Sequence, residues 1–191
     1  MRAAKAPVQG SGLGALLVAA VLAAPGAAPA GGVELARFGD WVLLSAGPGV
    51  CQLRHTLLSA QSGAVLLEML LLLPDPAETS ASGITPDADS PDTGALVALR
   101  VPLGVNLPDG IAWRHPATPA EAVGLEWQHC DAALCLAAGR ISSAELGRLQ
   151  RGNQIEVGFR PLPDAAPIRM QVSLRGVTAG WQALRGCAPA P

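Results

Sequence analysis

Four cysteines are the residues of this chain best suited to chemistry: Cys51, Cys130, Cys135 and Cys187. An even number of cysteines is typical of exported proteins that carry two disulfides. Cys130 and Cys135 end two strand-like runs that are joined by four residues. A hairpin would bring their Cα atoms to about 4.5–5.5 Å, which a disulfide tolerates. Four cysteines allow three pairings by count alone. The hairpin geometry predicts the pairing that contains a Cys130–Cys135 disulfide.

A catalytic role for Cys130 and Cys135 is the alternative interpretation, in which the chain is a periplasmic thiol-disulfide redox protein. Redox motifs usually place two residues between the cysteines, at a helix N-terminus that lowers the pKa of the thiol. Here four residues intervene and the flanking segments are strand-like. The spacing favours a structural disulfide and a protein that is not an enzyme.

The three histidines, His55, His115 and His129, do not occur in a spacing typical of metal ligands. His129 precedes Cys130, but an oxidised cysteine is neither a nucleophile nor a ligand. The sequence has no nucleophile elbow, dinucleotide fingerprint or phosphate-binding loop. We expect surface or hydrogen-bonded histidines, and we expect no catalytic residue, cofactor or metal ion.

Residues 74–94 form an acidic segment rich in proline, serine and threonine, with five acids and no base. Asp87, Asp89 and Asp92 could offer oxygen ligands to calcium, but the segment lacks the EF-hand spacing with its glutamate at position twelve. The composition favours a solvated loop.

Four tryptophans stand out in a chain that has no tyrosine: Trp41, Trp113, Trp127 and Trp181. Trp41 and Trp127 lie within strand-like runs, which favours packing in the core. An exposed tryptophan could instead anchor a partner or a sugar, and the sequence does not separate these roles.

The elements that would position these residues are mostly strands. Residues 155–160 and 168–175 alternate apolar and polar side chains, which is the pattern of half-buried antiparallel strands. Many short strands with turn residues between them predict a β-sandwich. Further strand-like runs occupy residues 41–46, 50–58, 65–73, 96–103, 111–114, 125–130 and 135–138.

One helix is predicted over residues 142–149. Ser142 can accept the free N–H groups of the first turn, and Glu145 three residues later completes a capping box. Leu146 and Leu149 would then share one face, and Gly152 would end the helix.

The N-terminal thirty residues have the parts of a cleavable signal peptide. Arg2 and Lys5 are followed by an apolar run over residues 13–24 and by Ala28-Pro29-Ala30, a small-residue cleavage site. The apolar run is shorter than the roughly 20 residues needed to span a bilayer. We predict cleavage after Ala30, a single domain over residues 31–191, and no integral membrane span after cleavage.

The predicted mature chain holds fifteen acids, eleven arginines and no lysine. Its arginines are scattered along the sequence rather than clustered. A modest negative charge without a basic stripe argues against binding to nucleic acid or to anionic membranes.

Several segments together resemble one family of bacterial exported proteins, the invasion-associated locus B family. They are Phe38-Gly39-Asp40-Trp41, the segment 101–107 followed by Gly110, the Cys-x4-Cys of Cys130 and Cys135, and Val172-Ser173-Leu174-Arg175-Gly176. The resemblance implies an immunoglobulin-like antiparallel β-sandwich with one or two short helices. It also implies a periplasmic or outer-membrane-associated protein, a link to host-cell invasion that comes from the family name, and no established catalytic residues.

Three positions depart from the family pattern. Ser45 stands where members usually have a cysteine, Leu134 replaces a glycine, and Val177 replaces an aromatic residue. The family pattern would pair Cys51 with a cysteine at position 45, so the resemblance leaves Cys51 without its partner and Cys187 as the thiol that remains. We therefore predict a Cys51–Cys187 disulfide.

The sequence as a whole predicts an exported, non-enzymatic interaction domain of the envelope. Its partner, an envelope or host protein, is not identified by the sequence.

Overall fold

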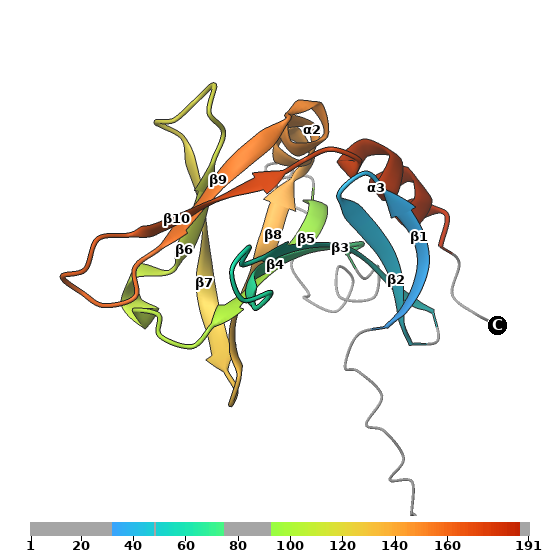
Figure 1. Ribbon diagram of the computed structural model, residues 1–191. Coiled ribbons are helices and arrows are strands. Elements are labelled where there is room, and N and C mark those ends of the chain that lie inside the picture. The colour runs from blue at the N-terminus through green and yellow to red at the C-terminus, as the bar shows by residue number, and fades with distance from the viewer. Residues whose placement is uncertain (1–31, 48, 75–92, 188–191) are drawn as a thin grey trace, which may run out of the picture.

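A computed structural model describes residues 32–47, 49–74 and 93–187 of the chain. Its strands all pair antiparallel, and two α-helices follow late in the chain (Figure 1). The strands are β1 (Val33–Phe38), β2 (Trp41–Gly47), β3 (Val50–Leu58), β4 (Val65–Leu72), β5 (Thr93–Pro102), β6 (Ile111–Arg114), β7 (Ala122–Cys130), β8 (Leu134–Ser142), β9 (Gln154–Phe159) and β10 (Ile168–Ser173). The helices are α2 (Ser143–Arg151), α3 (Val177–Arg185) and the short 3-10 helix η1 (Leu107–Asp109).

The strands form one hydrogen-bonded series in the order β1-β2-β3-β4-β5-β8-β7-β6-β9-β10. Strand β7 joins two halves of this series, because its first residues pair with β6 and its last residues pair with β8. The register shifts between Trp127 and His129, and such an irregularity lets a strand pass from one layer to another. The predicted all-β class is confirmed, and the two halves are compatible with a sandwich.

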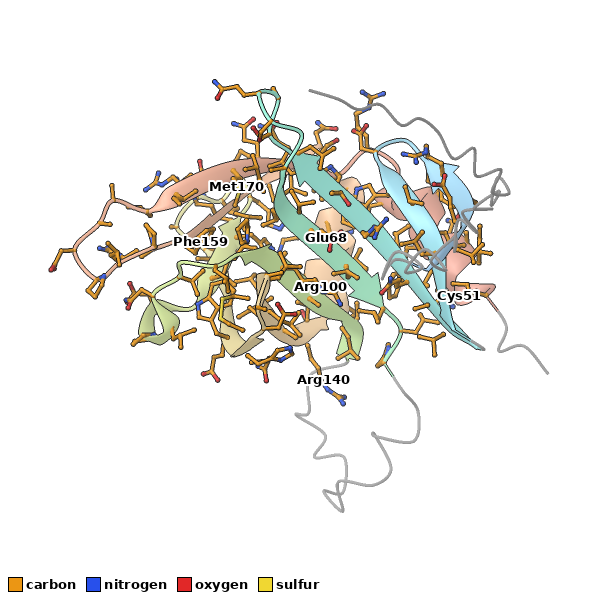
Figure 2. The ribbon with its side chains drawn as sticks, turned by 60° about the horizontal axis from the view of Figure 1, so that its bottom comes forward. Cys51, Glu68, Arg100, Arg140, Phe159 and Met170 are labelled. Carbon is orange, nitrogen blue, oxygen red and sulfur yellow. A yellow bond between two sulfur atoms is a disulfide. The ribbon has the colours of Figure 1, made fainter. Side chains whose placement is uncertain are left out.

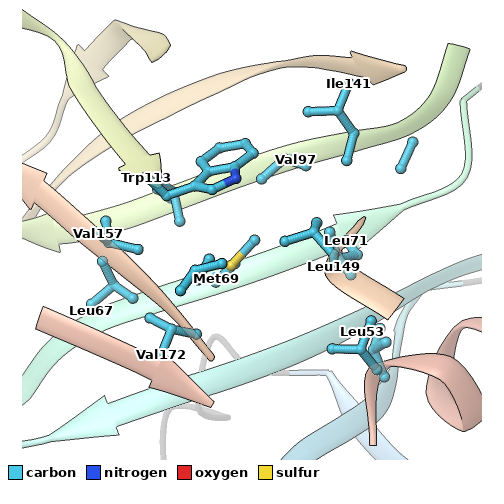
Figure 3. Close-up of a cluster of buried hydrophobic side chains, with 14 of the residues drawn as sticks. Leu53, Leu67, Met69, Leu71, Val97, Trp113, Ile141, Leu149, Val157 and Val172 are labelled. Atoms are coloured by element: carbon cyan, nitrogen blue, oxygen red, sulfur yellow. The ribbon is translucent and has the colours of Figure 1, made fainter. Parts of the chain in front are cut away.

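Buried side chains from both halves meet in one core (Figure 3). Leu67 and Met69 of β4 are fully buried, as are Val157 of β9 and Val172 of β10. Period-two alternation places these side chains on the inner face of their strands. The two strands predicted from alternation, β9 and β10, therefore contribute to the core together with β4.

Helix α2 begins as predicted, because the Ser142 hydroxyl accepts the backbone N–H of Glu145 at 3.2 Å. The Glu145 side chain, which would complete the predicted capping box, makes other contacts. The Glu145 carboxylate accepts hydrogen bonds from Trp113 and Arg148 and lies at hydrogen-bond distance from His115. Burying a carboxylate is costly unless hydrogen-bond donors surround it. Three such donors converge on the Glu145 carboxylate.

Helix α3 and strand β1 are elements that sequence reasoning missed. Helix α3 buries Val177, Trp181 and Leu184 at the end of the molecule where α2 also lies (Figure 1). A Cβ atom on Gly180 would lie 2.6 Å from the Leu53 side chain, so glycine lets this helix approach β3 closely. The Thr178 hydroxyl donates to the Gln150 carbonyl at 2.8 Å and joins α3 to α2.

Two of the family-like motifs meet in space and form a clasp, made of Gly39, Asp40, Trp41, Ser173 and the Arg175-Gly176 turn. The Asp40 N–H donates to the Arg175 carbonyl at 3.0 Å, and the Trp41 indole N–H donates to the Ser173 carbonyl at 2.9 Å. The Ser173 hydroxyl donates to the Asp40 carboxylate at 2.6 Å. Both glycines have positive φ angles, which favour glycine. These motif residues therefore join the turn between β1 and β2 to the end of β10.

Candidate functional site

The four cysteines lie as two pairs at disulfide distance. Cys130 and Cys135 face each other at the ends of β7 and β8, with Cα atoms 4.0 Å apart. Cys51 in β3 and Cys187 after α3 have Cα atoms 6.4 Å apart. These are the pairs that the sequence and the resemblance favour. Their oxidation in the exported protein stays a prediction.

The departure at Ser45 has a direct structural counterpart. Ser45 in β2 is the register partner of Cys51 in β3. A cysteine at position 45 would therefore face Cys51 across the two strands, as the family pattern requires. In this chain Cys51 lies at disulfide distance from Cys187 instead, and a bond between them would tie the end of α3 to the start of β3.

The three histidines lie apart and have different surroundings. His129 is exposed, and His115 is buried beside the Glu145 carboxylate. His55 packs beside the Trp41 ring, and its buried Nδ1 atom has no hydrogen-bond partner among the described residues. The prediction of surface or hydrogen-bonded histidines is thus wrong for His55. Burial lowers the pKa of His55, although the nearby Asp40 charge acts in the opposite direction.

Glu145 is the centre of a buried polar network that joins α2 to β6. Its Oε1 atom accepts the Trp113 indole N–H at 2.8 Å and lies 2.8 Å from Nε2 of His115. Its Oε2 atom accepts the Arg148 guanidinium, which also reaches Glu121 at 3.3 Å. Burial, the largest single influence, raises the pKa of Glu145. The hydrogen bonds from His115, Trp113 and Arg148 outweigh it, and the pKa lies below its ordinary value.

Strand β6 carries this network on one face and a surface pocket on the other. Trp113 points inward to Glu145, whereas its neighbours Ala112 and Arg114 point to the outer face. The pocket has a volume of about 240 Å³ and lies over β6, β9 and β10. A rigidly held Trp113 therefore fixes the strand that forms the pocket floor.

The floor of this pocket consists of small residues, and its walls are charged. Ala112 and Gly158 are register partners on β6 and β9, and Gly158 is in turn the partner of Arg169 on β10. On one side of this row the Arg114–Glu156 ion pair has an N···O distance of 2.5 Å. We call this hollow the arginine pocket, lined among others by Asp109, Ala112, Arg114, Glu156, Gly158, Arg160 and Arg169.

The arginine pocket carries more positive than negative charge. Arg114 and Arg169 share one carboxylate oxygen of Glu156, at 2.5 Å and 3.7 Å, and Arg160 lies 3.4 Å from Asp109. Three guanidinium groups thus face two carboxylates, in a chain whose formal net charge is −2. The arrangement can receive a further anionic group, because one positive charge is not balanced within the pocket.

The sequence did not reveal the arginine pocket, since its arginines come from three separate segments. The only available signal was the outward position of Arg160 and Arg169 on alternating strands. A neighbouring hollow shares Asp109, Gly110 and Ala112 with the pocket and extends it toward Trp127 on β7.

The half of the strand series that contains β3, β4 and β5 carries a different charged group on its outer face. Glu68 on β4 pairs with Arg54 and with Arg100, at N···O distances of 3.5 Å and 3.7 Å. Figure 2 shows Glu68 close to Arg100 on the neighbouring strand. The pairing β4–β5 places Glu68 directly opposite Arg100. Partly exposed pairs of this kind contribute at most about 1 kcal/mol to stability, so we treat them as surface support for the sheet.

The tryptophans mostly serve the core, as predicted for Trp41 and Trp127. Trp41, Trp113 and Trp181 are buried. Trp127 is half-buried and packs edge-on against Phe159, with ring centroids 6.1 Å apart.

Two predictions concern segments outside the described residues. The signal peptide and its cleavage after Ala30 lie in residues 1–31, and the calcium ligands Asp87, Asp89 and Asp92 lie in residues 75–92. Among the helices that the structure describes, none has the length and apolar character needed to cross a membrane.

Comparison with known proteins agrees with the fold and the motifs. The family model described as invasion associated locus B (IalB) protein matches residues 46–185. The crystal structure of invasion associated protein b from Bartonella henselae has a similar fold, with a TM-score of 0.60 and 17% sequence identity. That similarity covers 79% of this chain and 95% of the other. Comparison with the curated proteins gives no match.

The fold and its site define a class: an antiparallel all-β domain with two cysteine pairs at disulfide distance, a clasp of motif residues and a charged pocket on its outer face. Within that class, the chain belongs to the invasion associated locus B family, because the family model covers most of its length.

Proposed function

We propose that this protein is an exported, non-enzymatic interaction domain of the bacterial envelope, and that it binds its partner through the arginine pocket. The observation that carries the proposal is the pocket itself. It combines an apolar floor of Ala112 and Gly158 with exposed guanidinium groups held in place by ion pairs. Arginine in such a position recognises carboxylate or phosphate groups through paired hydrogen bonds.

The remaining polar residues support binding rather than catalysis. Asp40 and Ser173 belong to the clasp, and Glu145 and His115 hold α2 against β6. Each of these groups has a structural task that accounts for its position. A link to host-cell invasion and a periplasmic or outer-membrane location come from family membership and are part of the proposal.

Capture from an envelope extract tests this function. The mature protein, treated with a crosslinker in the extract, should recover an envelope protein. The Arg114→Ala/Arg160→Ala double variant should recover at least about tenfold less, because it removes two of the guanidinium groups of the pocket. Arg37→Ala on β1 is the matched control and should recover as much as the wild type. Equal recovery by the pocket variant would contradict the proposal.

The redox alternative makes a different prediction for Cys130 and Cys135. The two residues are cross-strand partners in a hairpin, and Cys135 is buried. The Asp131 carboxylate accepts the N–H groups of Ala133 and Leu134 and fixes the turn between them. A structural disulfide should have a reduction potential below about −300 mV, whereas a catalytic one lies well above it. A thiol titration therefore separates the two functions.

A further inference from the structure

We propose that the outer edge of β10, with which no strand among the described residues pairs, binds an extended peptide segment beside the arginine pocket as an added β-strand, and that acidic and apolar residues alternate in this segment. This inference rests on the proposed function and names the chemistry of the partner. Strand β10 is the last strand of the series, at the other end of the strand order from β1, and in Figure 1 it lies beside β9.

The direction of the backbone groups along β10 follows from its pairing with β9. The Leu174 N–H donates to the Asn153 carbonyl at 2.9 Å, so the pair Leu174–Asn153 is hydrogen-bonded. Because bonded and non-bonded pairs alternate in an antiparallel ladder, Val172 and Met170 also bond to β9. The N–H and C=O groups of Arg169 and Gln171 then point away from the sheet.

One contact supports this reasoning independently. The Ser173 carbonyl lies two residues beyond Gln171 and therefore points away from β9, as the carbonyls of Arg169 and Gln171 do. It accepts a hydrogen bond from the Trp41 indole N–H rather than from a backbone N–H of another strand. The clasp thus closes the edge at Ser173. The open part of the edge extends over Ile168–Val172, which suits a short segment of four or five residues.

The two faces of β10 define the side chains of such a segment. Arg169 and Gln171 lie on the face of the arginine pocket, and the Arg169 side chain is 54% exposed. Ile168 and Met170 lie on the opposite face, where Ile168 is 43% exposed. A strand added here would place alternate residues next to Arg169 and next to Ile168, so acidic residues suit one face and apolar residues the other.

The charge of the edge selects against other partners. A second copy of β10 or a basic peptide would bring cationic side chains next to Arg169, and like charges directly opposite each other are unfavourable. An acidic strand instead meets the surplus positive charge of Arg114, Arg160 and Arg169.

Titration of the mature protein with a synthetic peptide of alternating valine and glutamate tests the inference. We expect the Arg169 and Gln171 amide signals to shift in the NMR spectrum and to gain protection from hydrogen exchange. Arg169→Glu should weaken binding at least about tenfold through like-charge repulsion. Gln171→Pro should abolish binding without disturbing β9, because it removes an N–H that faces away from β9. Arg37→Glu on the opposite edge strand should leave binding unchanged.

Several outcomes would overturn the inference. They are the absence of shifts at Arg169 and Gln171, equal binding of a valine–lysine peptide, and unchanged binding by Arg169→Glu. If Gln171→Pro fails to fold, the Arg169→Glu variant and the exchange data still decide. Failure with the peptide, together with envelope capture that depends on Arg114 and Arg160, would reject the added strand and leave the proposed function intact. If the peptide does not bind and envelope capture does not depend on Arg114 and Arg160, both the added strand and the proposed function are rejected.

Discussion

Replacing Cys187 by serine should lower the free energy of unfolding by about 4–5 kcal/mol, the largest effect we expect from any single change in this domain. Cys51 and Cys187 are 136 positions apart, so their bond constrains most of the unfolded chain. The loss should be measured by denaturant unfolding of the oxidised mature protein. Non-reducing peptide mapping should first find Cys51 linked to Cys187.

A matched variant separates the loop effect from the loss of a cysteine. Adding Ser45→Cys to Cys187→Ser gives Cys51 a partner directly across β2 and β3. This bond would close only a short loop, so it should restore about 2 kcal/mol rather than the full loss. A Cys187→Ser variant as stable as the wild type, or free thiols at both positions, would show that the long disulfide does not form.

Replacing Glu145 by alanine should cost about 3 kcal/mol, because it leaves three buried or partly buried donors without their acceptor. Trp113, His115 and Arg148 all contact its carboxylate, and Glu145 is only 3% exposed. Glu121, the exposed partner of Arg148, provides the control: Glu121→Ala should change stability by less than about 1 kcal/mol. Similar losses for both variants would contradict a central role for Glu145.

The pH dependence of stability gives a second measurement of the same network. The pKa of Glu145 is lower in the folded protein than its ordinary value. Its charge therefore contributes stability above the unfolded pKa of about 4.3, and this contribution is lost as pH falls through the folded pKa. The difference in stability between the wild type and Glu145→Gln should shrink as pH falls below about 4.3, where the Glu145 carboxylate becomes protonated. A difference that does not change with pH would contradict this assignment.

Local patterns predicted the strands that bury one regular face. Alternation identified β9 and β10, and the serine cap identified the start of α2 at Ser143. Strand β1 and helix α3 were missed for a physical reason. Helix α3 holds a glycine and a threonine, and it is stabilised by packing of Val177, Trp181 and Leu184 rather than by its own helix propensity.

The candidate site depends on pairings between distant strands, which single segments do not reveal. Arg114 on β6, Glu156 on β9 and Arg169 on β10 meet only because the strand order places β9 between β6 and β10. The role of Glu145 was misread for the same reason: a capping box is a local pattern, whereas Trp113 reaches the carboxylate from another strand. The structural role of the two family motifs is likewise visible only in the fold, where Asp40 of one motif and Ser173 of the other are hydrogen-bonded in the clasp.

Site-specific photocrosslinking in the living bacterium tests whether the arginine pocket is the surface that binds the partner. A benzophenone amino acid is placed at Ala122, which lines the arginine pocket, and in a separate strain at Ala46, an exposed alanine on β2. We expect one crosslinked envelope or host protein from position 122 and none from position 46. A partner crosslinked equally from both positions, or from position 46 alone, would contradict binding through the arginine pocket.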